Sequence, residues 1–191
     1  MRNLLSTKDQ RQLRLMETLI QNRNWMKLHE LAEKLGCTER ILKSDLNELR
    51  VAFPSIDIQS SVNGVMIDLE VNTSVEDIYQ YFLANSQSFQ LLEYLFFNEG
   101  LPIYRTVENL HSSNANLYRL GRNITKTLSA QFQIELSFTP SAIRGNEIDI
   151  RYFFAQYFSE RYYFLDWPFP DLPEEELTEF ADFFYKITNY P

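Results

Sequence analysis

The sequence predicts a mainly α-helical protein with small β wings, and two observations carry this prediction. A helix, a turn and a second helix follow one another from Leu28 to Leu49 and again from Val107 to Ile124. Each pair of helices is followed by residues typical of a short β-hairpin. The repeat therefore predicts two tandem winged helix-turn-helix domains plus a C-terminal helical segment.

The corner of the first motif follows from three consecutive residues. Gly36 tolerates the positive φ that such a corner needs, because it has no Cβ atom. We expect Cys37 to be a small buried side chain and not a reactive thiol. Thr38 can cap the second helix through its hydroxyl. The buried stripe of that helix is apolar at steps of three and four residues: Leu42, Leu46, Leu49 and Phe53.

The opposite face of this second helix is polar and suits the major groove of DNA. Its members can meet phosphates and base edges: Glu39, Arg40, Lys43, Ser44, Asn47 and Arg50. Pro54 ends the helix, and apolar residues then alternate around Asn63-Gly64, which predicts a hairpin wing. A winged fold that serves only protein contact is the alternative at this point.

The second unit repeats the first at a constant offset of 75 residues. Thr38, Leu42, Leu49 and Phe53 correspond to Ser113, Leu117, Ile124 and Leu128. The polar face of its second helix carries Asn114, Asn116, Tyr118, Arg119, Arg122 and Lys126.

The remaining elements of each unit follow from the same comparison. A preceding helix at Phe89–Phe97 corresponds to Lys8–Asn22 in the first unit. We expect the second wing to pair Ile134–Phe138 with Glu147–Arg151 around a turn at Arg144-Gly145, which places Arg144 near the wing tip. The corner at residues 111–113 lacks a glycine, so its geometry is less well defined by the sequence.

The C-terminal part is rich in aromatic residues, which we interpret as packing material. Three prolines interrupt the chain, and Glu174–Glu176 favour a new helix N-terminus. The helix that follows has an apolar face without an evident partner. We expect domains at residues 1–72, 73–160 and 161–191, the last being the start of a helical regulatory domain that continues beyond this chain.

The net charge of −8 is the main objection to nucleic-acid binding, because affinity for DNA depends on neutralised phosphates. Its distribution weakens the objection. Residues 1–50 carry a net +3 and residues 101–150 a net +1, whereas residues 51–100 carry −7 and residues 151–191 carry −5. The positive charges therefore coincide with the two helix-turn-helix motifs, and we expect modest binding that weakens with salt.

Several function classes lack their residues in this sequence. There is no Gly-rich phosphate loop, no zinc-ligand array and no Gly-x-Ser-x-Gly element. We therefore expect no enzyme activity, no cofactor and no metal. No apolar run approaches the roughly 18 residues of a membrane span, and no secretory signal is evident, so we expect a cytoplasmic protein without membrane contact.

Four stretches of the chain resemble the Mga family of transcriptional regulators from Gram-positive bacteria, which includes AtxA-like proteins. They are Leu31–Thr38, Asn116–Arg119, Arg144–Glu147 with Ile150–Phe154, and Tyr157–Glu160 with Phe164–Phe169. The first is generic to helix-turn-helix repressors, and the last two are more specific. The resemblance covers nearly the whole chain and identifies it with the N-terminal DNA-binding portion of such proteins.

The resemblance implies where the recognition helices lie and which domains follow them in the family. They run from about Thr38 to Arg50 and from Ser113 to Lys126. The DNA-binding candidates are Thr38, Arg40, Lys43, Ser44, Asn47, Ser113, Asn116, Tyr118, Arg119, Arg122, Lys126 and Arg144. Arg40 and Arg119 are the strongest, because a guanidinium can bridge two guanine acceptors or clamp a phosphate. In the family, two domains regulated by the sugar phosphotransferase system and an EIIB-like domain follow, so phosphotransferase partners are expected only through domains absent here.

These inferences favour a DNA-binding regulator of virulence or metabolism genes that recognises sequence or DNA shape in promoter regions, with A·T-rich or bent sites preferred. We expect a homo-oligomer in the full-length form. His29 and His111 lie in the helix-turn-helix motifs and are not expected to be phosphoacceptors. The competing class is an oligomerisation module with residual DNA binding. An RNA-binding antiterminator fits less well, because those proteins use a small all-β domain.

Overall fold

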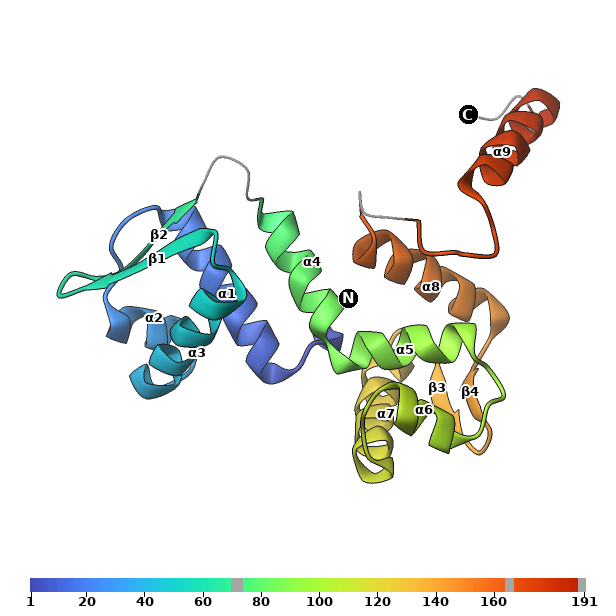
Figure 1. The fold of residues 1–191 in the computed structure, drawn as a ribbon, viewed down its shortest axis with the longest axis horizontal. Coiled ribbons are helices and arrows are strands. Elements are labelled where there is room, and N and C mark those ends of the chain that lie inside the picture. Colours follow the sequence, from blue (N-terminus) through green and yellow to red (C-terminus); the bar gives the residue numbers. More distant parts are fainter. Residues whose placement is uncertain (70–73, 164–166, 189–191) are drawn as a thin grey trace.

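The computed structural model describes residues 1–69, 74–163 and 167–188. The molecule is elongated, with a first winged unit and a second winged unit at either end of helix α4 (Val75–Asn85) (Figure 1). Within the described ranges, no helix is long and apolar enough to cross a membrane. The predicted junction at residues 72 and 73 lies outside the described residues.

The first winged unit has the elements that its sequence predicts. It contains η1 (Arg2–Leu4), α1 (Thr7–Asn22), α2 (Leu28–Lys34), α3 (Glu39–Ala52), β1 (Ile56–Ser61) and β2 (Gly64–Leu69). β1 and β2 pair antiparallel, with a register from Ile56 opposite Leu69 to Ser61 opposite Gly64. Met26 forms a bridge with Val65 through two backbone hydrogen bonds of 2.9 Å. The segment between α1 and α2 is thus tied to the wing.

The second winged unit repeats this order after an additional helix. It contains α5 (Gln87–Phe97), α6 (Ile103–Asn109), α7 (Asn114–Ser129), β3 (Glu135–Phe138) and β4 (Ser141–Arg144), followed by α8 (Glu147–Arg161). The stripes that the offset of 75 residues aligns are buried in both units. Leu42 and Leu117 are 0% and 1% exposed, and Thr38 and Ser113 both cap their helices as predicted.

The two corners have the same backbone geometry although only one contains glycine. Gly36 has φ 64° and His111 has φ 45°. In the first corner the amides of Gly36 and Cys37 donate to carbonyls in the last turn of α2, and the amides of His111 and Ser112 make the equivalent bonds to α6. Both are Schellman motifs, which need a left-handed residue at this position. His111 therefore accepts a conformation that costs a non-glycine residue about 1 kcal/mol.

The second wing differs from the prediction. Its turn is at Thr139-Pro140, and Phe138 faces Ser141 across it. Glu147–Arg151 is not a strand but the first turns of α8, because Asn146 caps that helix by accepting from the Ile148 amide at 2.8 Å. Arg144 pairs with Glu135 at the base of the hairpin, far from the tip. The prediction that Arg144 lies near the wing tip is wrong.

Helix α4, which we did not predict, packs between the two units. Its Tyr81 ring lies 4.6 Å from that of Phe53 at the end of α3. On its other side the Tyr79 hydroxyl donates to the Glu160 carboxylate of α8 at 2.6 Å, and the Gln80 amide donates to the Glu160 carbonyl. Burial and the Glu160 carboxylate raise the pKa of Tyr79, so this hydroxyl stays protonated. α4 thereby joins the first unit to α8.

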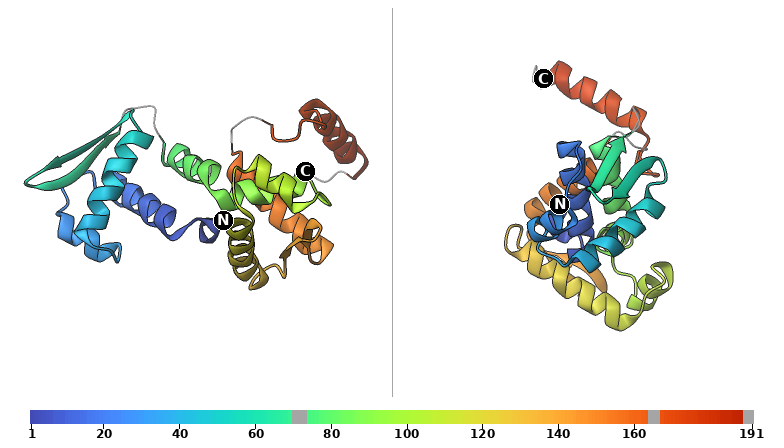
Figure 2. Two further views of the ribbon diagram at one scale, coloured as in Figure 1. Left: turned by 60° about the horizontal axis from the view of Figure 1, so that its bottom comes forward. Right: turned by 90° about the vertical axis from the view of Figure 1, so that its left-hand side faces the viewer.

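The aromatic C-terminal region divides into a packed helix and an exposed one. α8 buries Phe153, Phe154, Tyr157 and Phe158, which confirms their interpretation as packing residues. α9 (Glu174–Thr188) begins at the predicted acidic turn, yet none of its residues is buried. In the right-hand view of Figure 2 it lies at the top, whereas α7 lies at the bottom. Residues 164–166, part of the stretch that carries the family resemblance, lie outside the described residues.

Candidate nucleic-acid interface

The exposed face of α3 gathers the site residues predicted for the first unit. Arg40, Lys43, Ser44 and Asn47 are all exposed there. Thr38 stands at the N-terminus of the same helix, where its hydroxyl accepts from the Ile41 amide at 3.3 Å. The structure thus places these five predicted side chains on one accessible surface of α3.

Arg50 connects this helix to its wing. Its Nε donates to the Ile58 carbonyl at 2.9 Å, and its Nη2 donates to the Ser60 hydroxyl at 2.6 Å. Its Nη1 donates to Asn47 Oδ1 at 3.0 Å, which leaves the amide group of Asn47 as the donor available to a ligand. Arg50 therefore orients both the wing and one member of the predicted site.

A groove of about 550 Å³ separates α3 from the first wing. Sequence reasoning missed one of its cations, Lys27, because this residue precedes α2 and belongs to no helical pattern. Its Nζ donates to the Val62 carbonyl at the wing tip at 3.2 Å. Lys43 and Arg50 line the opposite wall. Three cations thus flank a groove between a helix and a hairpin.

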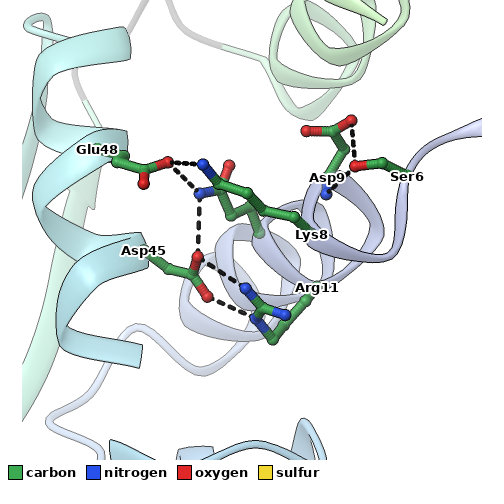
Figure 3. Close-up of polar contacts among 7 residues, drawn as sticks. Ser6, Lys8, Asp9, Arg11, Asp45 and Glu48 are labelled. Atoms are coloured by element: carbon green, nitrogen blue, oxygen red, sulfur yellow. Dashed lines mark hydrogen bonds and ion pairs between the residues drawn. The ribbon is translucent and has the colours of Figure 1, made fainter. Parts of the chain in front are cut away.

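The orientation of α3 is fixed from behind by a polar cluster on α1 (Figure 3). Arg11 donates to the Asp45 carboxylate through two bonds of 2.6 and 3.0 Å, and Gln12 donates to Asp45 at 3.1 Å. Asp45 is only 2% exposed. Nearby, Lys8 lies 2.5 Å from Glu48, and this contact with Lys8 holds the pKa of Glu48 below its ordinary range. Such charge-assisted pairs set the direction of the recognition face.

The predicted residues of the second unit fall into two groups on α7. Tyr118, Arg122 and Lys126 follow one another at steps of four and are exposed. The Tyr118 ring packs edge-on against Phe138 of the wing, with 5.2 Å between centroids. These three side chains form the outward face of the helix.

The other group lies closer to the body of the molecule. Arg119 Nη2 donates to Asn116 Oδ1 at 2.7 Å, while the Asn116 amide donates to the Ser112 hydroxyl at 2.9 Å and to Gln87 of α5 at 3.3 Å. Ser113 caps the helix, because its hydroxyl accepts a hydrogen bond from the backbone amide of Asn116. Arg144 is exposed but lies at the base of the second wing, apart from these residues.

The two recognition surfaces are equivalent in backbone and different in side chains. Applying the 75-residue offset, Arg40 corresponds to Ala115, Lys43 to Tyr118, Ser44 to Arg119, Asn47 to Arg122 and Val51 to Lys126. The positive charge is displaced toward the C-terminal half of α7. In Figure 1, α3 and α7 both lie on the lower side of the molecule, and the acidic α9 lies at the upper right.

The remaining chemistry of this surface is not that of a metal or thiol site. In the described part of the chain, no three His, Cys, Asp or Glu side chains are grouped to hold a metal ion. Burial raises the pKa of the Cys37 thiol, which keeps it protonated near neutral pH. Cys37 packs against the core but is only partly buried, so the expectation of a buried side chain holds only in part.

Comparison with known families gives two adjacent matches. The M protein trans-acting positive regulator (MGA) HTH domain matches residues 6–64, and the Mga helix-turn-helix domain matches residues 71–158. This chain belongs to the Mga family. In this Mga-family chain, the first match covers α1 to β1 and ends where β2 begins, and the second covers the second winged unit with α4 and most of α8.

Curated relatives of this Mga-family chain are regulators by name. A putative trans-acting regulator of Streptococcus pneumoniae is 46% identical over 191 residues, which cover 100% of this chain and 39% of that protein. The capsule synthesis positive regulator AcpA of Bacillus anthracis is 26% identical over 179 residues, 91% of this chain and 36% of AcpA. The anthrax toxin expression trans-acting positive regulator of Bacillus anthracis is 22% identical over 184 residues, 94% and 38% respectively. The chain thus spans about two-fifths of the length of these relatives.

Proposed function

We propose that this Mga-family chain binds double-stranded DNA in promoter regions, through α3 and α7, as the N-terminal part of a transcriptional regulator. One observation carries the proposal: two helices with equivalent backbones, α3 and α7, both lie on the lower side of the molecule in Figure 1. α3 exposes Arg40 and Lys43, and α7 exposes Arg122 and Lys126. A helix in this position enters a major groove, and cations on it neutralise phosphates. The names of the relatives support a regulatory role rather than an enzymatic one.

The wider setting belongs to the same proposal. We place the protein in the cytoplasm, where DNA is accessible, and divide it at residues 1–72, 73–160 and 161–191, in accord with the two family matches. Control by the phosphotransferase system, through domains that follow in longer relatives, and assembly into homo-oligomers are proposed for the full-length form. The helical α9 would then begin the regulatory part.

Replacing Arg40 or Arg122 by alanine should weaken duplex binding. For a contact to phosphate, we expect the slope of log affinity against log salt to fall by about 1, and for a contact to a guanine edge we expect a loss of about 1–3 kcal/mol confined to that base pair. Fluorescence anisotropy with promoter fragments over a salt series measures both. Lys186→Ala on α9 removes the same charge away from α3 and α7 and should leave the slope unchanged.

The competing oligomerisation module makes the opposite prediction. If one winged unit and the aromatic C-terminal segment hold subunits together, the substitution in that unit, Arg40→Ala or Arg122→Ala, changes the oligomeric mass in sedimentation equilibrium and leaves the small residual DNA affinity as it was. Unchanged mass with weakened binding supports the DNA-binding proposal. An unchanged salt slope together with an unchanged affinity for every duplex in both variants contradicts it.

Recognition of DNA shape should be visible in a comparison of duplexes. Two recognition helices on one elongated molecule engage separate grooves, and bending brings such grooves toward the protein at a cost that depends on sequence. We expect A·T-rich, intrinsically bent duplexes to bind more tightly than straight duplexes of equal length in a gel-shift series. Equal affinities would remove the shape component while leaving groove binding intact.

A further inference from the structure

A polar cavity of about 390 Å³ lies where the N-terminal segment meets the second unit. Three parts of the chain line it: residues 3–7 with Asp9, the corner between α4 and α5 at residues 85–88, and one face of α7 that includes Arg119 and Asn123. In Figure 1 the N-terminus lies beside this corner, with α7 below it. The outward face of α7, with Tyr118 and Arg122, does not line the cavity.

The start of α5 faces this cavity without a cap. The hydroxyl of its N-cap residue, Ser86, accepts no bond from the first turn. Ser86 and Ser88 are 3% and 8% exposed, and neither hydroxyl has a hydrogen-bond partner among the described residues. The first amides of a helix have no partner within it, so they need a cap, water or a ligand. The first amides of α5 and the two unpartnered hydroxyls are therefore hydrogen-bond donors that a ligand with acceptor oxygens can satisfy.

Further positive character converges on the same place. α1 also begins at the cavity wall, and the amides of Thr7 and Lys8 belong to its positive N-terminal end. Arg119 contributes a guanidinium whose only acceptor among the described residues is Asn116. Two helix starts and an arginine provide the donor geometry that tetrahedral oxyanions prefer.

Two features oppose an anion and sharpen the inference. Asp9 lines the cavity, and its Oδ2 accepts from the Ser6 hydroxyl at 2.7 Å. The C-terminal end of α4, with its partly negative carbonyls, is also close to the cavity. Two of these carbonyls are already occupied: the side-chain amide of Gln90 donates to the Ala84 carbonyl, and the side-chain amide of Asn85 donates to the Tyr81 carbonyl. Among the described residues that line the cavity, Asp9 is the only one with a carboxylate.

We propose that this cavity binds a phosphate-class oxyanion, held by the start of α5, the hydroxyls of Ser86 and Ser88, and Arg119. The anion comes either from a phosphodiester of bound DNA or from a free phosphate or phosphate monoester. Its binding tightens the contact between the N-terminal segment and α7. The site does not depend on the proposed DNA binding, because it is defined by this cavity alone.

Titration with inorganic phosphate tests the site directly. At constant ionic strength, set with chloride, we expect saturable changes in the amide NMR signals of Gln87 and Ser88 and a rise in melting temperature that follows the fraction bound. Changes that do not saturate, or that spread evenly over surface lysines, would overturn the proposal. No duplex is present in this titration, so its outcome is separate from that of the promoter-binding measurements.

Three substitutions make the result specific. Arg119→Ala should weaken phosphate binding about tenfold or more, since a charge-assisted bond is lost. Ser88→Asp places a carboxylate at the start of α5 and should abolish the phosphate response, whereas Asp9→Asn removes the repulsive charge and should tighten binding. Arg122→Ala, an arginine on the same helix outside the cavity, is the matched control and should keep the wild-type phosphate affinity. Equal affinity in Arg119→Ala and Arg122→Ala contradicts the assignment.

A competition arm identifies the source of the anion. If a promoter duplex displaces inorganic phosphate from Gln87 and Ser88, the site receives a DNA backbone phosphate. If phosphate and duplex bind together, the site serves a free phosphate or phosphate ester. Both results of the competition support an oxyanion site, whereas the outcomes named above for the titration and for the Arg119→Ala variant would overturn it.

Discussion

Replacing Gly64 by alanine should destabilise the first winged unit by about 3 kcal/mol or more. A Cβ atom at this position would lie 2.0 Å from the carbonyl oxygen of Met26, which is backbone and cannot rotate away. The residue also has φ 123°, a conformation that side chains rarely adopt. We expect the Met26–Val65 bridge to open, and the midpoint of urea unfolding to fall accordingly.

Gly36 provides the matched control for this substitution. It has φ 64°, but an added Cβ atom would meet nothing within 4 Å. Gly36→Ala should therefore cost only the conformational term of about 1 kcal/mol. Similar losses for the two variants would show that close approach of the wing to Met26 is not what makes Gly64 necessary.

The second large effect is expected at Asp45. Asp45→Ala leaves the Arg11 guanidinium without its acceptor inside the contact between α1 and α3, while the Gln12 side-chain amide keeps only its bond to Glu48. Breaking a buried ion pair on one side costs about 3–5 kcal/mol, and we expect the lower end because the Arg11 side chain is 20% exposed. Denaturant unfolding measures the loss, and duplex affinity should fall with it because α3 loses its support.

Glu48→Gln tests whether the large loss of stability expected for Asp45→Ala is caused by the burial of its ion pair. Glu48 is on the same helix and contacts Lys8, but both side chains are about half exposed, so we expect less than about 1 kcal/mol. A double-mutant cycle between Arg11→Ala and Asp45→Ala should give a favourable coupling energy. A coupling near zero would show that the pair does not hold α1 to α3.

The elements that sequence analysis predicted well are those with strong periodicity. The apolar stripe of α3 and its counterpart on α7 specify two helices, and the 75-residue offset specifies that they are equivalent. The first wing follows from Asn63-Gly64. These features depend on local patterns, which a single sequence displays directly.

The second wing shows where local patterns mislead. Glu147–Arg151 alternates polar and apolar residues as a strand does, yet it forms α8, because Asn146 caps it and the aromatic residues that follow pack at helical spacing. The two strands of this wing have four residues each, too few to fix a register by alternation. Arg144 was misplaced as a result.

Helix α4 carried a signal that our sequence analysis did not use. Ser74 and Asp77 form a capping box, with reciprocal bonds of 3.1 and 2.8 Å, and this spacing is visible in the sequence. By contrast, Lys27 at the wing groove and the cavity at Ser88 depend on contacts between distant segments. No local pattern predicts which residues such contacts bring together.

The position of α4 limits how the molecule can meet a long polymer. α4 packs on Phe53 at one side and on Glu160 at the other. These contacts hold the two winged units at a fixed distance from each other. If both units bind one duplex, the distance between their two contact regions is then fixed relative to the helical repeat of the DNA. Promoters read by both units would tolerate base changes between the two contact regions more readily than the insertion of half a turn.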